Sequence, residues 1–141
     1  MNLCMTQDIH ESMIRHAREV YPRECCGMLA GEDRLISAIF PFVNRLDSEN
    51  SFWMDPADLI LFFKKIRAGK LHHLGIYHSH PATRACPSPR DIREAFYPDC
   101  SHFIVSLENL EAPVVQAFRV LEGEVTTEEI ILVGQGGGRP G

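Results

Sequence analysis

The stretch from residue 74 to residue 91, LGIYHSHPATRACPSPRD, decides both the fold and the chemistry of this chain. Its first four residues, 74–77, are largely apolar and predict a short buried strand. On an extended chain, side chains two residues apart leave the same face, so His78 and His80 are expected to point toward the same place. Pro81 cannot donate to a sheet ladder and is expected to end the strand directly after the second histidine. The pair would then lie at an edge or end of the sheet, where a substrate can reach it.

Two imidazoles at this spacing suit a metal ion, but they hold it poorly by themselves. Catalytic zinc usually has three protein ligands and keeps its fourth tetrahedral position for water. Asp91, a short distance further along the chain, is the candidate for the third ligand. A His-x-His pair on an exposed strand is also common without any metal. On this pattern alone, a metal site and a solvated histidine pair both remain open.

The segment that carries Asp91 also fits the start of a helix. Ser88 suits the N-cap, Pro89 the first helical position and Asp91 the third. A capping role and a ligand role are compatible, because an aspartate in the first turn can face out of the helix end toward an ion. The joint occurrence of the histidine pair, the serine and the aspartate favours the metal site.

These residues carry a resemblance to a known family. The run from His78 to Pro81, followed by Ser88 and Asp91, resembles the His-x-His-Pro-x6-Ser-x2-Asp signature of the JAMM (MPN-plus) metallopeptidases. The segment 21–27, YPRECCG, is similar to the Pro-Arg-Glu-x-Cys-Gly element of the small bacterial branch of that family. The segment 52–56, FWMDP, is similar to its aromatic-x-Met-Asp-Pro segment. The resemblance covers most of the chain.

The resemblance implies a role for each matching residue. It implies that His78, His80 and Asp91 hold Zn²⁺. Glu24 takes the role of general base, and Ser88 donates its hydroxyl to the oxyanion that develops in the transition state. The implied fold is a single-domain α/β/α sandwich with a mixed, curved sheet, similar to the cytidine-deaminase architecture.

The resemblance also implies a substrate. The short bacterial members look like enzymes that release cysteine, or another amino acid, from the carboxyl-terminal glycine of a ubiquitin-like sulfur-carrier protein ending in Gly-Gly. Phe52 and Met54 are candidates for substrate binding, because their segment could pair as an edge strand with an extended glycine tail. Packing of these two side chains inside the domain is an equally open interpretation.

Three other functions are open. A general deubiquitinase-like isopeptidase would use the same site, but few residues separate Glu24 from His78, which leaves little room to recognise two ubiquitins. A catalytically silent scaffold of the same fold would normally lack the ligands, and here the set is complete. A thiol hydrolase using Cys25 or Cys26 is disfavoured, because no cysteine-protease signature surrounds them.

Length and composition predict one enzyme-sized domain. The chain has 141 residues, 45% of them hydrophobic, which is enough for one proper core. We expect this domain to cover residues 1–133. The glycine-rich tail, residues 134–141, is expected to be flexible because it has too little apolar surface to offset the entropy of ordering.

Charge and cysteine content restrict the partners and the compartment. The net charge of −5 disfavours binding to nucleic acid. No apolar run approaches the roughly 20 residues that span a bilayer, and no signal peptide is apparent, so we expect a cytoplasmic protein without membrane association. Five cysteines, an odd number without a CxxC pair, predict free thiols. Cys86 lies in the loop before Ser88 and has no assigned role, and a homodimer remains open.

The rest of the pattern alternates helices with strands. This alternation predicts a mixed sheet covered by helices on both faces. The remaining histidines (His10, His16, His72, His73 and His102) are expected to serve packing or the surface, with 72 and 73 in a turn. Helices are expected over 8–20, 55–68 and 88–96, and strands over 25–30, 35–40, 74–78, 102–107, 114–121 and 125–133.

Overall fold

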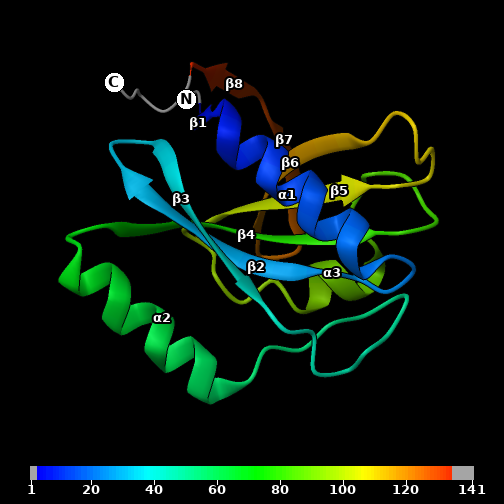
Figure 1. Ribbon diagram of the computed structural model, residues 1–141, viewed down its shortest axis with the longest axis horizontal. Coiled ribbons are helices and arrows are strands. Elements are labelled where there is room, and N and C mark those ends of the chain that lie inside the picture. The colour runs from blue at the N-terminus through cyan, green and yellow to red at the C-terminus, as the bar shows by residue number, and fades with distance from the viewer. Residues whose placement is uncertain (1–2, 135–141) are drawn as a thin grey trace.

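The computed structural model describes residues 3–134 and contains three helices and eight strands in that range (Figure 1). The helices are α1 (Gln7–Val20), α2 (Pro56–Ala68) and α3 (Pro89–Arg93). The strands are β1 (Leu3–Thr6), β2 (Cys26–Glu32), β3 (Leu35–Phe42), β4 (His72–His80), β5 (Ser101–Ser106), β6 (Val114–Leu121), β7 (Glu124–Glu128) and β8 (Ile130–Val133). Apart from residue 134, the predicted flexible tail lies outside the described residues.

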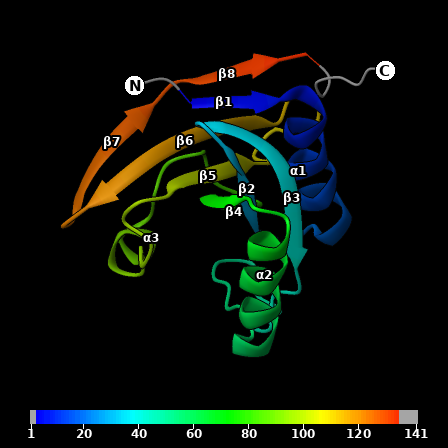
Figure 2. The same ribbon diagram turned by 90° about the vertical axis from the view of Figure 1, so that its left-hand side faces the viewer.

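All eight strands form one curved sheet in the order β7-β6-β5-β4-β2-β3-β1-β8. β7 and β8 lie at opposite edges of this sheet, yet only Glu129 separates them in the sequence. The two edges must therefore approach each other, and Figure 2 shows the sheet arching round until β7 leads into β8. The sequence predicts a single strand over 125–133. That prediction is wrong, because the chain passes from one sheet edge to the other in the middle of this run.

Helices cover both faces of the sheet, as predicted, and each face has its own apolar core. On one face, α1 buries Ile9, Met13 and Ala17 against β-strand residues that include Leu29. On the other face, α2 packs against β-strand residues that include Met28. Leu29 and Met28 are neighbours on β2, and they serve opposite cores because successive side chains on a strand alternate between faces. Figure 1 shows α1 and α2 on opposite sides of β2 and β4.

The ends of α2 follow the predicted signals. The Asp55 side chain caps the helix by accepting a hydrogen bond from the Ala57 N–H at 2.8 Å. Pro56 occupies the first turn, and Gly69 follows the last helical residue. The loop before this cap, residues 52–54, lies beside the end of β4, where the two histidines are. The capped start of α2 therefore also positions this loop.

The central strand β4 positions the histidine pair. It pairs antiparallel with β2 and parallel with β5. It ends at His80, as Pro81 predicts. It begins at His72, so the predicted turn at 72 and 73 is wrong. Both of these histidines pair with β2, which extends the strand toward its start. The His73 ring also packs against Phe62, Phe63 and Tyr97.

The helices and the cysteines bear on the compartment expected from the sequence. Within residues 3–134, no helix has the length and apolar character needed to cross a membrane. The five cysteines are free, as predicted.

Candidate metal site

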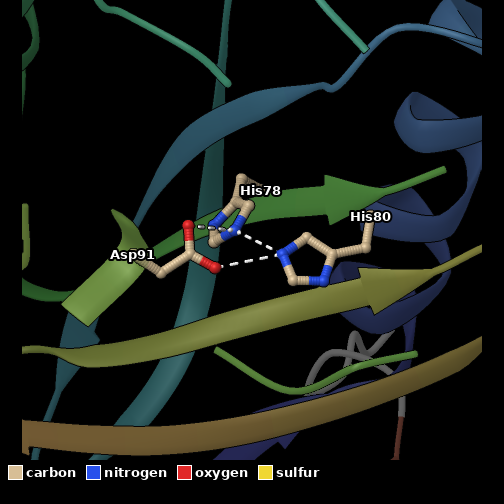
Figure 3. A group of neighbouring side chains, drawn as sticks. All are labelled: His78, His80 and Asp91. Carbon is tan, nitrogen blue, oxygen red and sulfur yellow. Dashed lines mark hydrogen bonds and ion pairs between the residues drawn. The ribbon is translucent and has the colours of Figure 1, made fainter. Parts of the chain in front are cut away.

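Three side chains predicted as ligands converge at the end of β4 (Figure 3). His78 and His80 leave the same face of the strand, and Asp91 reaches them from the first turn of α3. The Asp91 carboxylate faces both rings, with Oδ1 at 3.3 Å from His78 Nε2 and Oδ2 at 3.0 Å from His80 Nε2. The two Nε2 atoms are 3.2 Å apart. All the potential ligand atoms therefore lie within 4.8 Å of one another.

Neighbouring groups fix the orientation of each of these side chains. The Nδ1 atom of His80 is 3.0 Å from the Arg84 carbonyl, which only accepts, so this ring nitrogen is assigned as the N–H donor. The Phe52 ring stacks on the ring of His78, with centroids 4.9 Å apart and planes 28° apart. Such second contacts hold imidazole ligands in one rotamer and one tautomer.

Ser88 and Asp91 form the predicted capping box. The Ser88 N–H donates to Asp91 Oδ2 at 2.9 Å, and the Asp91 N–H donates to Ser88 Oγ at 3.1 Å. The serine oxygen accepts in this arrangement, so its O–H remains able to donate. Capping and a ligand role for Asp91 are compatible here, because the same carboxylate faces both the helix end and the histidines.

The donor set fits a cation. Because the Arg84 carbonyl holds one proton of His80 on Nδ1, a cation has only to displace the proton with which Nε2 bonds to Asp91, and the freed lone pair then faces His78 Nε2 and the Asp91 carboxylate. Burial disfavours ionisation of Asp91, but hydrogen bonds from the two histidines outweigh it and lower the pKa of the carboxyl. Burial also opposes protonation of His80, but Asp91 and the Arg84 carbonyl outweigh it and raise the pKa of the ring. The shifts keep Asp91 ionised and favour positive charge at His80, as expected for a carboxylate paired with imidazoles.

Glu24 lies two residues before β2, close enough to His80 and Asp91 for their charges to act on it. The next residue, Cys25, forms two hydrogen bonds with Ser79, which lies between His78 and His80 in the sequence. The Cys25 N–H donates to Ser79 Oγ at 2.8 Å, and the Ser79 N–H donates to the Cys25 carbonyl at 3.1 Å. Glu24 is only 4% exposed, and its Oε1 has no hydrogen-bond partner among the described residues.

The environment of Glu24 sets its protonation. Burial raises the pKa of this carboxyl to about 8, and the nearby charges of His80, Asp91 and Arg90 modify the shift in opposing directions. A carboxyl with a pKa near neutrality exchanges a proton readily in both directions, which suits a general base that later acts as an acid.

An apolar pocket opens beside His78 and Asp91, on the side of α3. Phe52 and Met54 line it together with His78 and Asp91. Both predicted interpretations of Phe52 and Met54 have support, because the two side chains also pack into the core beneath α2. The exposed aromatic rings of Trp53 and Phe96 belong to the same wall; their relative exposures are 50% and 73%.

His102 is a pocket residue that sequence reasoning misses. It lines the pocket with His78, and its buried Nε2 has no hydrogen-bond partner among the described residues. Burial, reinforced by His78, lowers the pKa of His102 to about 4, so the ring is neutral. Its position follows from the parallel pairing of β4 with β5, which sets Ile76 opposite His102, and no local pattern in the sequence reveals that pairing.

The structure argues against a thiol hydrolase. Cys25 and Cys26 are 1% and 0% exposed, so a substrate carbonyl cannot reach either sulfur. Burial raises the pKa of both thiols to about 12, which leaves almost no thiolate at neutral pH. Cys86 is exposed in the loop between Pro81 and Ser88.

Comparison with known proteins places this site in a family. Residues 6–121 match the family described as prokaryotic homologs of the JAB domain. The chain is 32% identical over 136 residues to the CysO-cysteine peptidase of Mycobacterium tuberculosis, covering 94% of this chain and 92% of that protein. It is 35% identical over 94 residues to a probable TtuB-protein conjugate cleaving protease of Thermus thermophilus, covering 66% of this chain and 63% of that protein.

Solved structures agree with this placement. A protein from Desulfitobacterium hafniense superposes with a TM-score of 0.86 at 38% identity, covering 94% of each chain. A JAB1/MPN domain protein from Archaeoglobus fulgidus superposes with a TM-score of 0.63 at 16% identity, covering 94% of this chain and 97% of that one, which shows a shared fold. The named relatives are peptidases, and the predicted family resemblance is confirmed. The chain therefore belongs to the family of prokaryotic homologs of the JAB domain and is a hydrolase.

Proposed function

We propose that the chain is a zinc-dependent peptidase that hydrolyses the amide bond after the carboxyl-terminal glycine of a ubiquitin-like sulfur-carrier protein and releases an amino acid such as cysteine. The observation that carries this proposal is the convergence of His78, His80 and Asp91 beside the buried carboxyl of Glu24. The names of the two peptidase relatives support the substrate class.

His78, His80 and Asp91 would hold the zinc. Two imidazoles and one carboxylate are a donor set typical of catalytic zinc, which keeps a position open for the reaction. When bound, the zinc supplies Lewis-acid polarisation of the scissile carbonyl and lowers the pKa of water. The Arg84 carbonyl keeps the proton of His80 on Nδ1 and so leaves Nε2 ready to act as a ligand.

Glu24 would move the proton. Its carboxylate accepts a proton from the attacking water and then delivers that proton to the amine that leaves. General acid–base catalysis of this kind contributes about 10²–10⁴-fold to the rate. Burial raises the pKa of Glu24, which makes its carboxylate a stronger proton acceptor for the first transfer.

Ser88 would stabilise the transition state. Its Oγ accepts the Asp91 N–H within the capping box, so the cap holds the hydroxyl in place while its proton remains free to donate. Because negative charge on the carbonyl oxygen develops only during attack, a donor fixed beforehand favours the transition state over the ground state.

Phe52 and Met54 would bind the tail of the carrier. The backbone N–H of Trp53 donates to the Asn44 side chain, and its carbonyl accepts from the Arg45 N–H, at 3.1 and 3.0 Å. The backbone groups of Phe52 and Met54 would then be the ones that pair with the tail. A glycine tail, with no side chains, suits strand pairing in such a narrow place.

Mass spectrometry on a carrier with one added carboxyl-terminal cysteine tests the proposal. We expect loss of that residue alone, abolished by a chelator and restored by zinc. Efficient cleavage of linked ubiquitin chains with no action on the carrier would instead favour a general isopeptidase, and inactivity on both with zinc bound would favour a silent scaffold.

The free cysteines support a location in a reducing compartment such as the cytoplasm.

A further inference from the structure

A peptidase that releases a single residue has to accommodate a free carboxylate close to the reacting amide. In such a substrate the carboxylate and the scissile nitrogen share one α-carbon. The surroundings of this carboxylate already contain two acidic groups, Glu24 and Asp91. A zinc dication would offset these two negative charges but leave no net positive charge for a third carboxylate, which would need a further cation within reach. The released residue therefore calls for a positively charged side chain beside the site.

Arg90 is in the right place. It lies on α3, next to the ligand Asp91, and its charge reaches Glu24, where it opposes the larger effect of burial on the pKa of that carboxyl. Its Nε atom is 3.4 Å from Oε1 of Glu94, which lines the same pocket as His78 and Asp91. The guanidinium thus lies beside a residue that lines the pocket and within electrostatic range of the proposed general base.

The ion pair between Arg90 and Glu94 is easily broken in favour of a substrate carboxylate. The Arg90 and Glu94 side chains are 48% and 46% exposed, and the pair has only one contact, at 3.4 Å. Exposed ion pairs of this kind contribute little to stability, so giving up the contact costs little. A substrate carboxylate can instead accept two parallel N–H bonds from the planar guanidinium, which is the geometry that arginine favours.

We propose that Arg90 binds the free carboxylate of the released residue, and that this contact makes the chain selective for carriers with one residue after the terminal glycine. This inference rests on the proposed function. It names the feature that separates release of an amino acid from cleavage of an isopeptide bond, since the lysine of an isopeptide bond carries the scissile nitrogen on its side chain and has no carboxylate on the adjacent carbon.

Two semisynthetic carriers that differ in one charge test this site. Both are the same ubiquitin-like protein ending in Gly-Gly-Cys, one with a free carboxylate and one with a carboxamide. With zinc-loaded wild-type enzyme we expect kcat/KM to be about tenfold higher for the acid. Arg90→Gln should remove this preference by slowing the acid alone, and Arg90→Lys should keep part of it, because it keeps the charge but not the planar fork.

Arg93→Gln is the matched control. Arg93 is an exposed arginine on the same short helix, and its removal should leave the preference for the acid unchanged. Equal cleavage of acid and amide by the wild type, or a preference that survives in Arg90→Gln, would overturn the carboxylate site while leaving the peptidase intact. Cleavage of neither carrier by wild type with zinc bound would overturn the proposed function itself, and this inference with it.

Discussion

Replacing Glu24 by glutamine should stabilise the metal-free protein, and by an amount that depends on pH. Burial raises the pKa of Glu24 from 4.5 to about 8, so the folded protein holds a proton that the unfolded chain releases between these values. The folded state therefore binds more protons than the unfolded state in this window, and wild-type stability falls as the pH rises through it. Glutamine does not titrate, so the variant escapes that loss.

The size of the effect follows from the same interval. At about 1.4 kcal/mol per pH unit, the shift from 4.5 to about 8 gives an upper limit of about 5 kcal/mol at pH 8 and above. Relaxation around the charge reduces this limit, so we expect Glu24→Gln to exceed the wild type by about 2–3 kcal/mol at pH 8. At pH 4.5 both side chains are mostly neutral, and the difference should be close to zero.

Urea unfolding of chelator-treated protein at pH 5, 6, 7 and 8 measures this difference. Other titrating groups are common to both proteins and cancel from the comparison. Glu111→Gln, at an exposed position, is the control and should show the same small difference at every pH. A Glu24→Gln difference that stays constant from pH 5 to pH 8 would refute the assignment of Glu24 to a desolvated position beside the site.

Three further predictions address other parts of the account. Ser88→Ala should keep the metal and lower turnover by about 10²-fold, measured at saturating substrate, and unchanged turnover would remove the oxyanion role. Gly27→Ala should destabilise the fold by about 1–3 kcal/mol in urea unfolding, because its Cβ would lie 2.3 Å from the Tyr77 ring; a neutral result would mean that this ring moves freely. Thiol alkylation of a Cys86→Ser variant, which lacks the exposed thiol of the loop before Ser88, should leave turnover unchanged because Cys25 and Cys26 are buried, whereas loss of activity that tracks modification of either would restore the thiol mechanism.

Local sequence signals predict the elements that hold the site. Pro81 predicts the end of β4, and the serine, proline and aspartate at 88–91 predict the capped start of α3, so the candidate ligands could be named from the sequence. Both signals act through neighbouring backbone groups, which is why they are readable in the sequence. The helix itself is shorter than predicted and ends at Arg93, because the apolar residues that follow turn toward the pocket.

Long-range pairing accounts for what the sequence does not reveal. β1 has only four residues, and it exists because it lies between β3 and β8 in parallel register. His102 enters the pocket for a similar reason, through the pairing of β5 with β4. In both cases the partner strand is distant in the sequence, so no local periodicity identifies it.

The measurement that tests the central claim most directly is zinc content together with turnover in two variants. Wild-type protein should carry one zinc per chain. Glu24→Gln should keep that zinc and lose about 10²-fold or more of its turnover, because the amide has the same shape but does not accept the proton. The double variant His78→Ala with His80→Ala should lose both zinc and activity. Near-normal turnover in zinc-loaded Glu24→Gln, or undiminished zinc in the double variant, would contradict the assignment of base and ligands.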